Sequence, residues 1–484
     1  MKLTDLEPKA PFKYFLELSG IPRGSGNEKA SSDYVMGFAR ERGLEAWQDE
    51  AFNVVIRKPA TPGFENAPRV IIQGHIDMVC EKDKGIDHDF TKDGLNIVVD
   101  GEYIRASGTT LGADDGVAVA YGIALLAADD IPHPPLTVII TTGEEIGLLG
   151  AAALDPAYLE GDMLINLDAG GDGIFVGGCA GGARCTLTLK GETGLVTETD
   201  AIYEITVAGL QGGHSGGDIK KERGNANKIL GRLLYGLIDY NPQIISIEGG
   251  EKENAIPRDA SALVSVSAAY ETVFQEKLLM LAEEIRSEHA ISDPGLVFIH
   301  KAHKDKQRKA FNAECSRTII ETLVMLPSGV MHMEQALPEF VETSVSIGVV
   351  RTDDQAGSVT FFASVRSSVA SRKAEVIQTL RAIAAQTGAA FSTGSDYPAW
   401  KYNQKSAIRD ICAETYKELF GKEPQFLAVH GGLECGLFAE KRPGLDMVAF
   451  GPDMYDYHSP KERLDIKSFG RTWELIKAVL RNIK

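Results

Sequence analysis

Short apolar segments alternate with helical segments in the first third of the chain. The segments that stand out as buried strands are residues 70–73 (VIIQ), 136–140 (LTVII) and 163–167 (MLINL), with a further one at 445–450. Strands buried on both faces form continuous apolar runs, and they belong to parallel sheets that helices cover. Helical patterns separate these runs, as in the alanine-rich residues 116–128. The alternation predicts an α/β fold with a mostly parallel sheet flanked by helices.

A different rhythm occupies the middle of the chain. Amphipathic helices such as residues 272–288 alternate there with half-buried strands, which is typical of an α+β arrangement. We therefore expect a catalytic domain made from residues 1–186 and 396–484, with a lid domain inserted at 187–395. Because the α+β rhythm repeats about twice, the lid should contain two ferredoxin-like halves.

Charge and cysteine content limit the partners and the compartment. The 484 residues include 68 acidic and 50 basic side chains, for a formal net charge of −18. Such a chain repels phosphate backbones and anionic lipid surfaces, so we expect neither nucleic acid nor membrane as a partner. The six cysteines form no C-x-x-C pair, and the start MKLTDLEPKAPFKYF has no signal-peptide pattern. These features indicate a cytoplasmic protein with reduced thiols.

Several metal-ligating side chains follow the predicted strands directly. They are His75 and Asp77 after residues 70–73, Glu144 and Glu145 after residues 136–140, Asp168 after residues 163–167, and His458 after residues 445–450. Each alone has a plainer explanation, such as a structural histidine or a solvated loop. Ligand sites in open α/β sheets lie beyond the carboxyl ends of the strands, so the whole set is expected to meet there.

Two adjacent aspartates open the alanine-rich helix. Asp114 and Asp115 follow a glycine-rich loop, where one acidic side chain would be enough to cap the helix. One of these aspartates, together with His75, Glu145, Asp168 and His458, makes a set of five side chains, which is enough to bind two cations. A single aspartate shared between the two ions is the economical arrangement, and it leaves Glu144 free as a base.

The order of these motifs resembles that of the two-zinc metallopeptidases of the aminoacylase and carboxypeptidase-G type. The segments that carry the resemblance are GHIDMVCEK, GTTLGADDGVAVAYGIALL, TTGEEIGLLGA, INLDAGGDGIFVGGCAGG, LQGGHSGGDI and GPDMYDYHSPKERL, and they span nearly the whole chain. The resemblance implies that His75, Asp168, Glu145 and His458 bind two metal ions and that Asp114 bridges them, with Asp115 as the second choice. It also implies that Asp77 orients His75 and that Glu144 is the general base and acid.

The same resemblance implies an activity. We expect a dinuclear-metal dipeptidase that hydrolyses unblocked dipeptides and prefers Xaa-His, including β-alanyl-histidine. The attacking group would be a hydroxide that bridges the two metal ions, with Glu144 as the general base. The ions are expected to be Zn²⁺, with Co²⁺ or Mn²⁺ as alternatives. A homodimer through the lid domain is expected as well. Other possibilities are an N-acyl amino acid hydrolase or carboxypeptidase of the same fold, and a catalytically inactive metal-binding relative.

Residues of the lid and of one later loop are candidates for substrate binding. In relatives, a lid histidine in the position of His214 helps to stabilise the tetrahedral oxyanion. Arg366 is the candidate for binding the substrate carboxylate, because a guanidinium matches that group with two parallel hydrogen bonds. Asn254 and Glu434 are further candidate contacts, although core or turn roles fit these two residues equally well.

Overall fold

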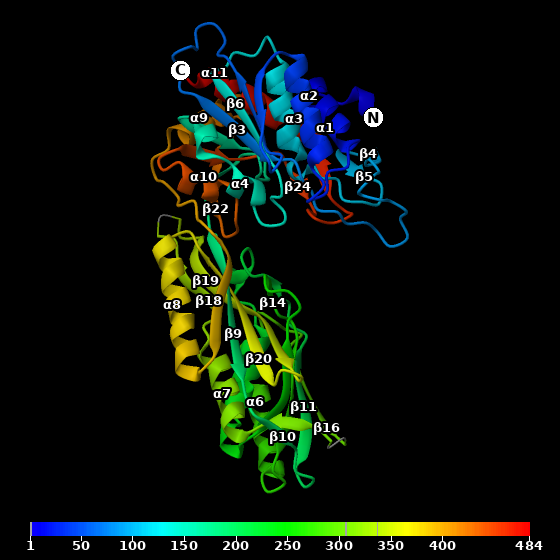
Figure 1. Cartoon of the computed structure of the whole chain (residues 1–484), viewed down its shortest axis with the longest axis vertical. Coiled ribbons are helices and arrows are strands. Elements are labelled where there is room, and N and C mark those ends of the chain that lie inside the picture. The colour runs from blue at the N-terminus through cyan, green and yellow to red at the C-terminus, as the bar shows by residue number, and fades with distance from the viewer. Residues whose placement is uncertain (1, 305–306, 336) are drawn as a thin grey trace. The chain divides into compact units, whose positions relative to one another are not determined.

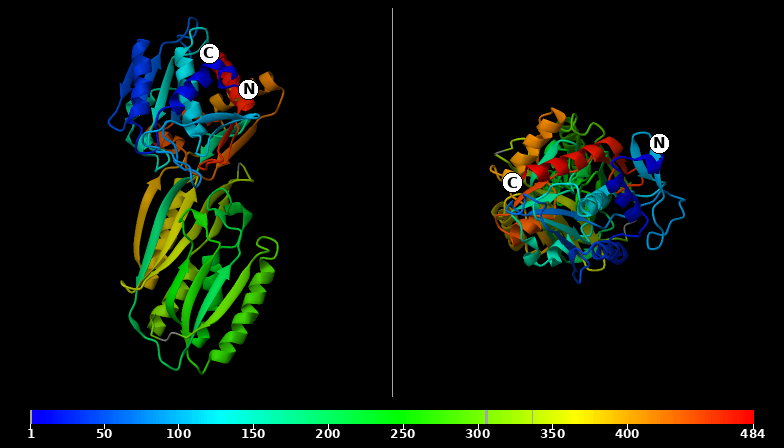
Figure 2. Two further views of the ribbon diagram at one scale, coloured as in Figure 1. Left: turned by 90° about the vertical axis from the view of Figure 1, so that its right-hand side faces the viewer. Right: turned by 90° about the horizontal axis from the view of Figure 1, so that it is seen from above.

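The chain divides into two compact units in the computed structural model, which describes residues 2–304, 307–335 and 337–484. Unit 1 runs from the N-terminal segment to Cys179 and includes Trp400–Ala428 and Leu433–Lys484, whereas unit 2 comprises Ala180–Ala399 and Val429–Gly432 (Figure 1). Both ends of the chain therefore belong to unit 1 (Figure 2).

Unit 1 is built on a sheet with the strand order β1-β2-β6-β3-β7-β23-β8-β22. The strands at its centre pair in parallel: β6 (Leu136–Thr141), β3 (Val70–His75), β7 (Met163–Asn166) and β23 (Asp446–Ala449). The strands toward its edges include antiparallel pairs: β1 (Glu45–Gln48), β2 (Val54–Lys58) and β8 (Ile174–Cys179), with β22 (Gln425–Val429) at one end. The expected mostly parallel α/β sheet is confirmed. The antiparallel strands toward its edges were not predicted.

Helices cover this sheet because its central strands are apolar on both faces. Ile72, Val138 and Ile165 share one core with residues of the covering helices: α1 (Lys9–Ser19), α2 (Lys29–Glu41), α3 (Ala113–Ala127), α9 (Ala407–Phe420) and α11 (Ile466–Asn482). Alternate residues of the same strands, such as Ile71 and Ile139, point to the opposite face and are also buried. Two shorter helices, α4 (Leu149–Ala153) and α10 (Cys435–Lys441), pack against each other.

Small side chains let α3 lie directly against β3. A Cβ atom at Gly74 would come within 2.2 Å of the Ala118 methyl group, so the helix and the strand approach too closely for any larger residue at position 74. A Cβ atom at Gly122 would lie 2.9 Å from Val138 on the neighbouring strand. This close packing brings the first turn of α3, which carries Asp114 and Asp115, to the carboxyl end of β3.

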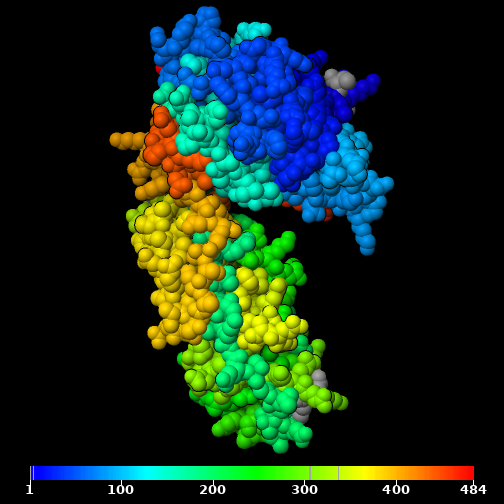
Figure 3. All heavy atoms as spheres, in the orientation of Figure 1, coloured from blue at the N-terminus to red at the C-terminus, as the bar shows by residue number. Residues whose placement is uncertain are grey.

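A small antiparallel sheet holds the loop that carries His458. Its strand order is β24 (Met454–Tyr455), β25 (Arg463–Asp465), β5 (Tyr103–Ala106) and β4 (Ile97–Asp100). His458 lies in the connection between β24 and β25. The part of this region around β4 and β5 projects from unit 1, in light blue at the right of Figure 3.

Unit 2 contains a long antiparallel sheet with helices packed against it. Its strand order is β16 (Val297–His303), β11 (Ala201–Ala208), β15 (Ala260–Val266), β13 (Gln243–Gly249), β19 (Val341–Asp353), β20 (Ser358–Ser367), β9 (Gly181–Lys190) and β21 (Ala390–Tyr397), and β18 (Gly329–Met333) also pairs with β19. The helices that share its core are α5 (Ala226–Tyr235), α6 (Glu271–Glu288), α7 (Ala313–Met325) and α8 (Ala370–Thr387). The strands β13 and β19 pair only at Gly249 and Val350, so a narrow contact joins the two parts of the sheet.

Two shorter pairings complete unit 2. The strand β10 (Thr193–Leu195) pairs with β17 (Lys309–Phe311), and β12 (Gly213–His214) pairs with β14 (Ala255–Ile256). Among the described residues, none of the helices in either unit is both long enough and apolar enough to span a bilayer.

Candidate active site and metal centre

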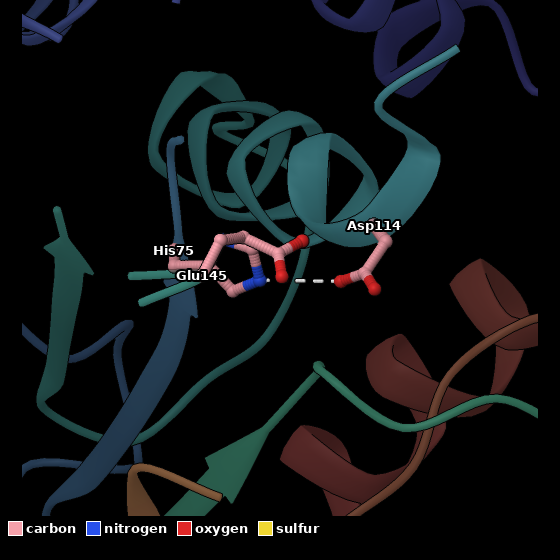
Figure 4. Close-up of side chains that lie close together, drawn as sticks. All are labelled: His75, Asp114 and Glu145. Atoms are coloured by element: carbon pink, nitrogen blue, oxygen red, sulfur yellow. Dashed lines mark hydrogen bonds and ion pairs between the residues drawn. The ribbon is translucent and has the colours of Figure 1, made fainter. Parts of the chain in front are cut away.

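The predicted ligands of unit 1 meet beyond the carboxyl ends of its parallel strands. His75 is the last residue of β3, Glu145 follows β6, and Asp168 follows β7. Asp114 comes from the first turn of α3, and His458 comes from the β24–β25 connection. Figure 4 shows His75, Glu145 and Asp114 pointing toward one another from these separate elements.

Asp114 lies between the two histidines. Its Oδ1 atom is 3.1 Å from His75 Nε2, and its Oδ2 atom is 3.4 Å from His458 Nε2. His458 Nε2 is also 3.0 Å from Glu145 Oε1, and His75 Nε2 is 3.9 Å from Asp168 Oδ1. Each oxygen of Asp114 thus belongs to a different cluster of donor atoms, one with His75 and Asp168 and the other with His458 and Glu145.

His458 adopts a left-handed backbone conformation, with φ of 56°. For a residue other than glycine, this conformation costs roughly 1–2 kcal/mol. Such strain is often retained where a side chain has to point into a functional site. The half-exposed imidazole of His458 does point at Asp114 and Glu145, and its hydrogen bonds to these two carboxylates raise its pKa to about 10.

Asp77 connects His75 to the loop after β6. Its Oδ1 atom lies 3.3 Å from His75 Nδ1 and accepts a hydrogen bond from the backbone N–H of Glu144, at 3.0 Å. Its Oδ2 atom accepts from the N–H of Glu145 and from the hydroxyl of Ser25. Burial opposes ionisation of Asp77, but the interaction with His75, together with the hydrogen bonds from Ser25 and the Glu144 N–H, outweighs it and lowers the pKa. An ionised Asp77 holds the ring of His75 so that Nε2 faces the other ligands.

Asp115 differs from Asp114 in its contacts. Its side chain is fully buried, and its Oδ2 atom accepts a hydrogen bond from the backbone N–H of His75, at 3.2 Å. Its Oδ1 atom is buried without a hydrogen-bond partner. One Asp115 oxygen nevertheless lies within 4.8 Å of ligand atoms of His75 and Asp168.

Divalent cations fit this donor set. Carboxylates outnumber imidazoles at the site, and buried like charges are costly unless a cation or a proton balances them. Burial, together with the neighbouring acids, accordingly raises the pKa of Asp168 well above its usual range when no cation is present. Ligand atoms of His75, Asp114 and Glu145 lie within 4.8 Å of one another, and the same holds for His75, Asp115 and Asp168. Mixed histidine and carboxylate ligands are typical of zinc, and cobalt and manganese also bind such sets.

Glu144 stands next to the ligands without belonging to either cluster of donor atoms. Burial raises its pKa to about 8, the carboxylates of Glu434 and Asp114 add to the shift, and His75 acts in the opposite direction. A carboxyl group with a pKa near neutrality can both accept and release a proton during turnover. The arrangement therefore places a carboxyl group with a raised pKa beside a candidate metal centre.

Glu434 directly precedes α10 in unit 1, and its side chain reaches β3 and β6. Its side chain is fully buried, and its Oε2 atom accepts hydrogen bonds from Gln73 Nε2 at 2.5 Å and from the hydroxyl of Thr141 at 2.7 Å. Burial raises its pKa to about 7, and its Oε1 atom has no hydrogen-bond partner. In this position Glu434 links β3 to β6.

In unit 2, His214 is held as a neutral hydrogen-bond donor. Its Nδ1 atom accepts hydrogen bonds from the backbone N–H groups of Gly216 and Gly217, at 3.3 and 3.1 Å. Burial lowers its pKa, and the charge of Arg366 lowers it further. The proton of the neutral ring is therefore on Nε2, which can donate to an external oxygen.

Arg366, Asn254 and His430 lie around the same end of unit 2. The guanidinium of Arg366 is buried and donates a hydrogen bond to the hydroxyl of Tyr397, at 3.2 Å, while its Nε atom has no partner. His430 shares a 2.7 Å hydrogen bond with the hydroxyl of Ser344, and burial lowers its pKa to about 3. Asn254 is exposed, and its backbone carbonyl oxygen accepts a hydrogen bond from the N–H of Ser215, next to His214.

Several contributors were not predicted from the sequence. They are Ser25 and Arg23 from the N-terminal region, Glu462 after His458, and Tyr397 near Arg366. Glu462 stands between a lysine and an arginine and has the local pattern of a solvated side chain, yet it is buried. No local signal distinguishes it, because its partners are backbone groups about 350 residues earlier.

The parallel sheet and the site together define a hydrolase of the metallopeptidase class, and the comparison with family models agrees. Residues 71–482 match the model of peptidase family M20/M25/M40, and the chain belongs to that family. The expected metallopeptidase class and the family resemblance are both confirmed.

Two relatives with more than 30% identity match over nearly their whole length. The chain is 37% identical to the cytosol non-specific dipeptidase of Escherichia coli over 484 residues, covering all of this chain and 99% of that protein. The crystal structure of aminoacylhistidine dipeptidase from Vibrio alginolyticus is similar with a TM-score of 0.93 and 35% identity, covering 100% of this chain and 98% of the other. The aminopeptidase PepT of Bacillus cereus shares the fold at a TM-score of 0.59 and 17% identity, covering 99% of each chain.

Proposed function

We propose that this protein is a dinuclear-metal dipeptidase that hydrolyses unblocked dipeptides, with a preference for Xaa-His that includes β-alanyl-histidine. The observation that carries the proposal is the position of Asp114, with one oxygen beside His75 and the other beside His458. The substrate class rests on the printed names of the two full-length relatives.

The donor clusters suggest how two ions would be held. His75 and Asp168 would hold one ion, Glu145 and His458 would hold the other, and Asp114 would bridge them. Zn²⁺ is the ion we propose, since neutral imidazoles and carboxylates are its usual oxygen and nitrogen ligands. When bound, such a pair of ions lowers the pKa of water and polarises a carbonyl oxygen.

The residues of unit 1 then supply orientation and proton transfer. Asp77 fixes the ring of His75 and, through two N–H groups, the backbone of Glu144 and Glu145. Glu144 takes the proton of the attacking water and delivers it to the amine that leaves. Its raised pKa suits both steps, because the proton is held neither too tightly nor too loosely near neutral pH.

Residues of unit 2 would recognise the substrate. We assign His214 to the oxyanion that forms on the scissile carbonyl, since Nε2–H is its free donor. Arg366 would bind the free carboxylate with its guanidinium, and Asn254 lies next to His214 as a further polar contact. For Glu434, its burial between Gln73 and Thr141 favours support of the strand ends over direct contact with substrate.

We also propose a cytoplasmic homodimer. All six cysteines are free thiols, as a reducing compartment would keep them. The partner would be a second copy, bound through β16, which is the outermost strand at one end of the described sheet of unit 2. Exposed apolar side chains gather on this strand and on α6: Val297, Ile299, Leu279 and Met280. An unpaired edge with apolar neighbours is a common site for adding another strand.

The direct test of the function is hydrolysis of a panel of unblocked Xaa-His dipeptides by zinc-loaded protein. N-acylated amino acids and tripeptides serve as comparison substrates, and EDTA-treated protein is the control. We expect hydrolysis of the dipeptides that EDTA abolishes and added Zn²⁺ restores. Faster hydrolysis of N-acylated substrates would replace this proposal with an N-acyl amino acid hydrolase, and metal-independent activity would contradict it.

A further inference from the structure

Glu462 binds the backbone of the turn that presents Asp114. Its two carboxylate oxygens accept hydrogen bonds from four consecutive N–H groups: Leu111 and Gly112 to Oε2 at 2.8 and 3.0 Å, and Ala113 and Asp114 to Oε1 at 2.8 and 3.4 Å. The side chain is 2% exposed. These donors precede or open α3, so they have no carbonyl partner within the helix.

Arg23 holds the same turn through its carbonyl oxygen. Its Nη2 atom donates to Gly112 O at 2.5 Å, and its Nη1 atom donates to Ile76 O at 2.8 Å. The carboxylate and the guanidinium thus bind the N–H and the C=O of one residue, Gly112. The second hydrogen bond connects the turn to the residue that follows His75 in the chain.

Glycines make room for this guanidinium. A Cβ atom at Gly112 would lie 2.5 Å from Arg23 Nη2, and a Cβ atom at Gly116 would lie 2.7 Å from it. Gly112 also has φ of 64°, a conformation that glycine adopts without strain. The glycines of this segment therefore leave room for a buried arginine.

Both charges are fully buried, and both act on backbone groups. Arg23 is 1% exposed, and burial lowers its pKa while Glu462 is the strongest of the charges that oppose the shift. A buried charge that loses its partner is left uncompensated. The pair is therefore positioned to keep the turn in one conformation.

We propose that Glu462, supported by Arg23, is a positioning residue that fixes the carboxylate of Asp114 between the two sets of metal ligands. The inference rests on the proposed dinuclear site. It deepens that proposal by naming the group that sets the geometry of the bridging ligand. Glu462 itself touches neither the reacting atoms nor the proposed ligand atoms in the contacts described above.

The test is the variant Glu462→Gln, which keeps the size of the side chain but replaces one acceptor oxygen with an NH₂ group that faces N–H donors. Glu474→Gln, on the exposed face of α11, is the matched control. Amide hydrogen exchange is measured on EDTA-treated protein, and zinc affinity is measured by equilibrium dialysis with elemental analysis. kcat and KM on an unblocked dipeptide complete the comparison.

We expect Glu462→Gln to speed exchange in peptides that cover residues 108–116, without faster exchange in the core of unit 2. Zinc affinity should fall about 10- to 100-fold, which is the usual effect of removing a residue that orients a ligand. The loss of activity should appear in kcat more than in KM, since no substrate contact is removed. Glu474→Gln should match the wild-type protein in each measurement.

Unchanged exchange over residues 108–116, or wild-type zinc affinity, in Glu462→Gln would overturn the inference. Wild-type protein that binds no zinc would instead overturn the proposed function, and the exchange measurement on metal-free protein would still decide whether Glu462 holds the turn. If Glu462→Gln does not fold, Arg23→Lys tests the same turn from the carbonyl side. That variant keeps the charge and loses one of the two donor groups.

Discussion

Adjacent carboxylates differ in their contacts at two places in this chain. Asp114 extends toward two histidines, whereas Asp115 accepts a hydrogen bond from the backbone of β3. Glu145 lies 3.0 Å from His458, whereas Glu144 stands apart with a raised pKa. Neighbouring side chains leave the backbone in different directions. In a pair of identical residues, one side chain can therefore point toward the candidate metal ligands while the other makes different contacts.

Glu144→Gln should separate catalysis from metal binding. The amide cannot take up the proton of the attacking water, so we expect kcat to fall about 10²- to 10⁴-fold. Because Glu144 belongs to neither cluster of donor atoms, metal content measured by elemental analysis should equal that of the wild-type protein. Near wild-type turnover, or loss of the metal, would contradict the assignment.

Arg366→Lys should reveal the group that binds the substrate carboxylate. A lysine keeps the charge but cannot form two parallel hydrogen bonds, so kcat/KM for dipeptides should fall about 10- to 100-fold, mainly through KM. Dipeptide amides, which lack the free carboxylate, provide the control. If the variant loses as much activity on the amides as on the acids, Arg366 has another role.

The sequence predicted the residues that follow strands and left out those that act through the backbone. His75, Glu145 and Asp168 could be found because an apolar strand precedes each of them. Glu462 and Arg23 could not, since a side chain that binds distant N–H or C=O groups leaves no spacing pattern near itself.

At the scale of elements, the buried strands were predictable and the sheet edges were not. The expected strand at residues 136–140 corresponds to β6, and the one at 163–167 to β7, within one residue at their ends. The edge strand β1 (EAWQ) is short and half polar, so it resembles a loop in the sequence. Its neighbour β2 (VVIRK) begins with three buried β-branched residues, which are a strand signal that the prediction missed. The helix expected at residues 272–288 corresponds to α6, which begins one residue earlier at Glu271.

Glu434 should make the link between β3 and β6 sensitive to pH. Burial raises its pKa to about 7 in the folded protein, above the ordinary value of 4.5 for a glutamate, so the folded state holds an extra proton between these two pH values. The free energy of unfolding contributed by Glu434 is therefore highest below about pH 4.5 and falls as pH rises toward 7, by up to about 3 kcal/mol.

The variant Glu434→Gln cannot titrate and should gain stability relative to wild type over that pH range. Urea unfolding of EDTA-treated protein at several pH values measures the difference, and Glu414→Gln, an exposed position on α9, is the control. A constant difference between wild type and Glu434→Gln across the range would show that Glu434 titrates normally.

At the scale of the whole molecule, each unit has its own core, and the chain passes between them more than once. The strand β9 begins at Gly181, where Gly181 pairs with Ser367 and Gly182 with Arg366. The segment that leads out of β8 in unit 1 is thus already part of the sheet of unit 2. Composition does not mark that position, because both units use apolar strands on either side of it.

The proposed dimer depends on the apolar edge of unit 2. Ile299→Lys places a charge on β16, so we expect light scattering coupled to size-exclusion chromatography to show a monomer. Ile291→Lys is the control, since Ile291 is 96% exposed and lies outside α6 and β16. A dimer that persists in Ile299→Lys would place the interface elsewhere.

The central claim is that Asp114 bridges two metal ions, and anomalous X-ray scattering from zinc-loaded crystals tests it most directly. We predict two anomalous peaks per chain, about 3.5–4 Å apart, with one near His75 and Asp168 and the other near Glu145 and His458. The carboxylate of Asp114 should lie between them. A single peak, or two peaks that Asp114 does not join, would contradict the account.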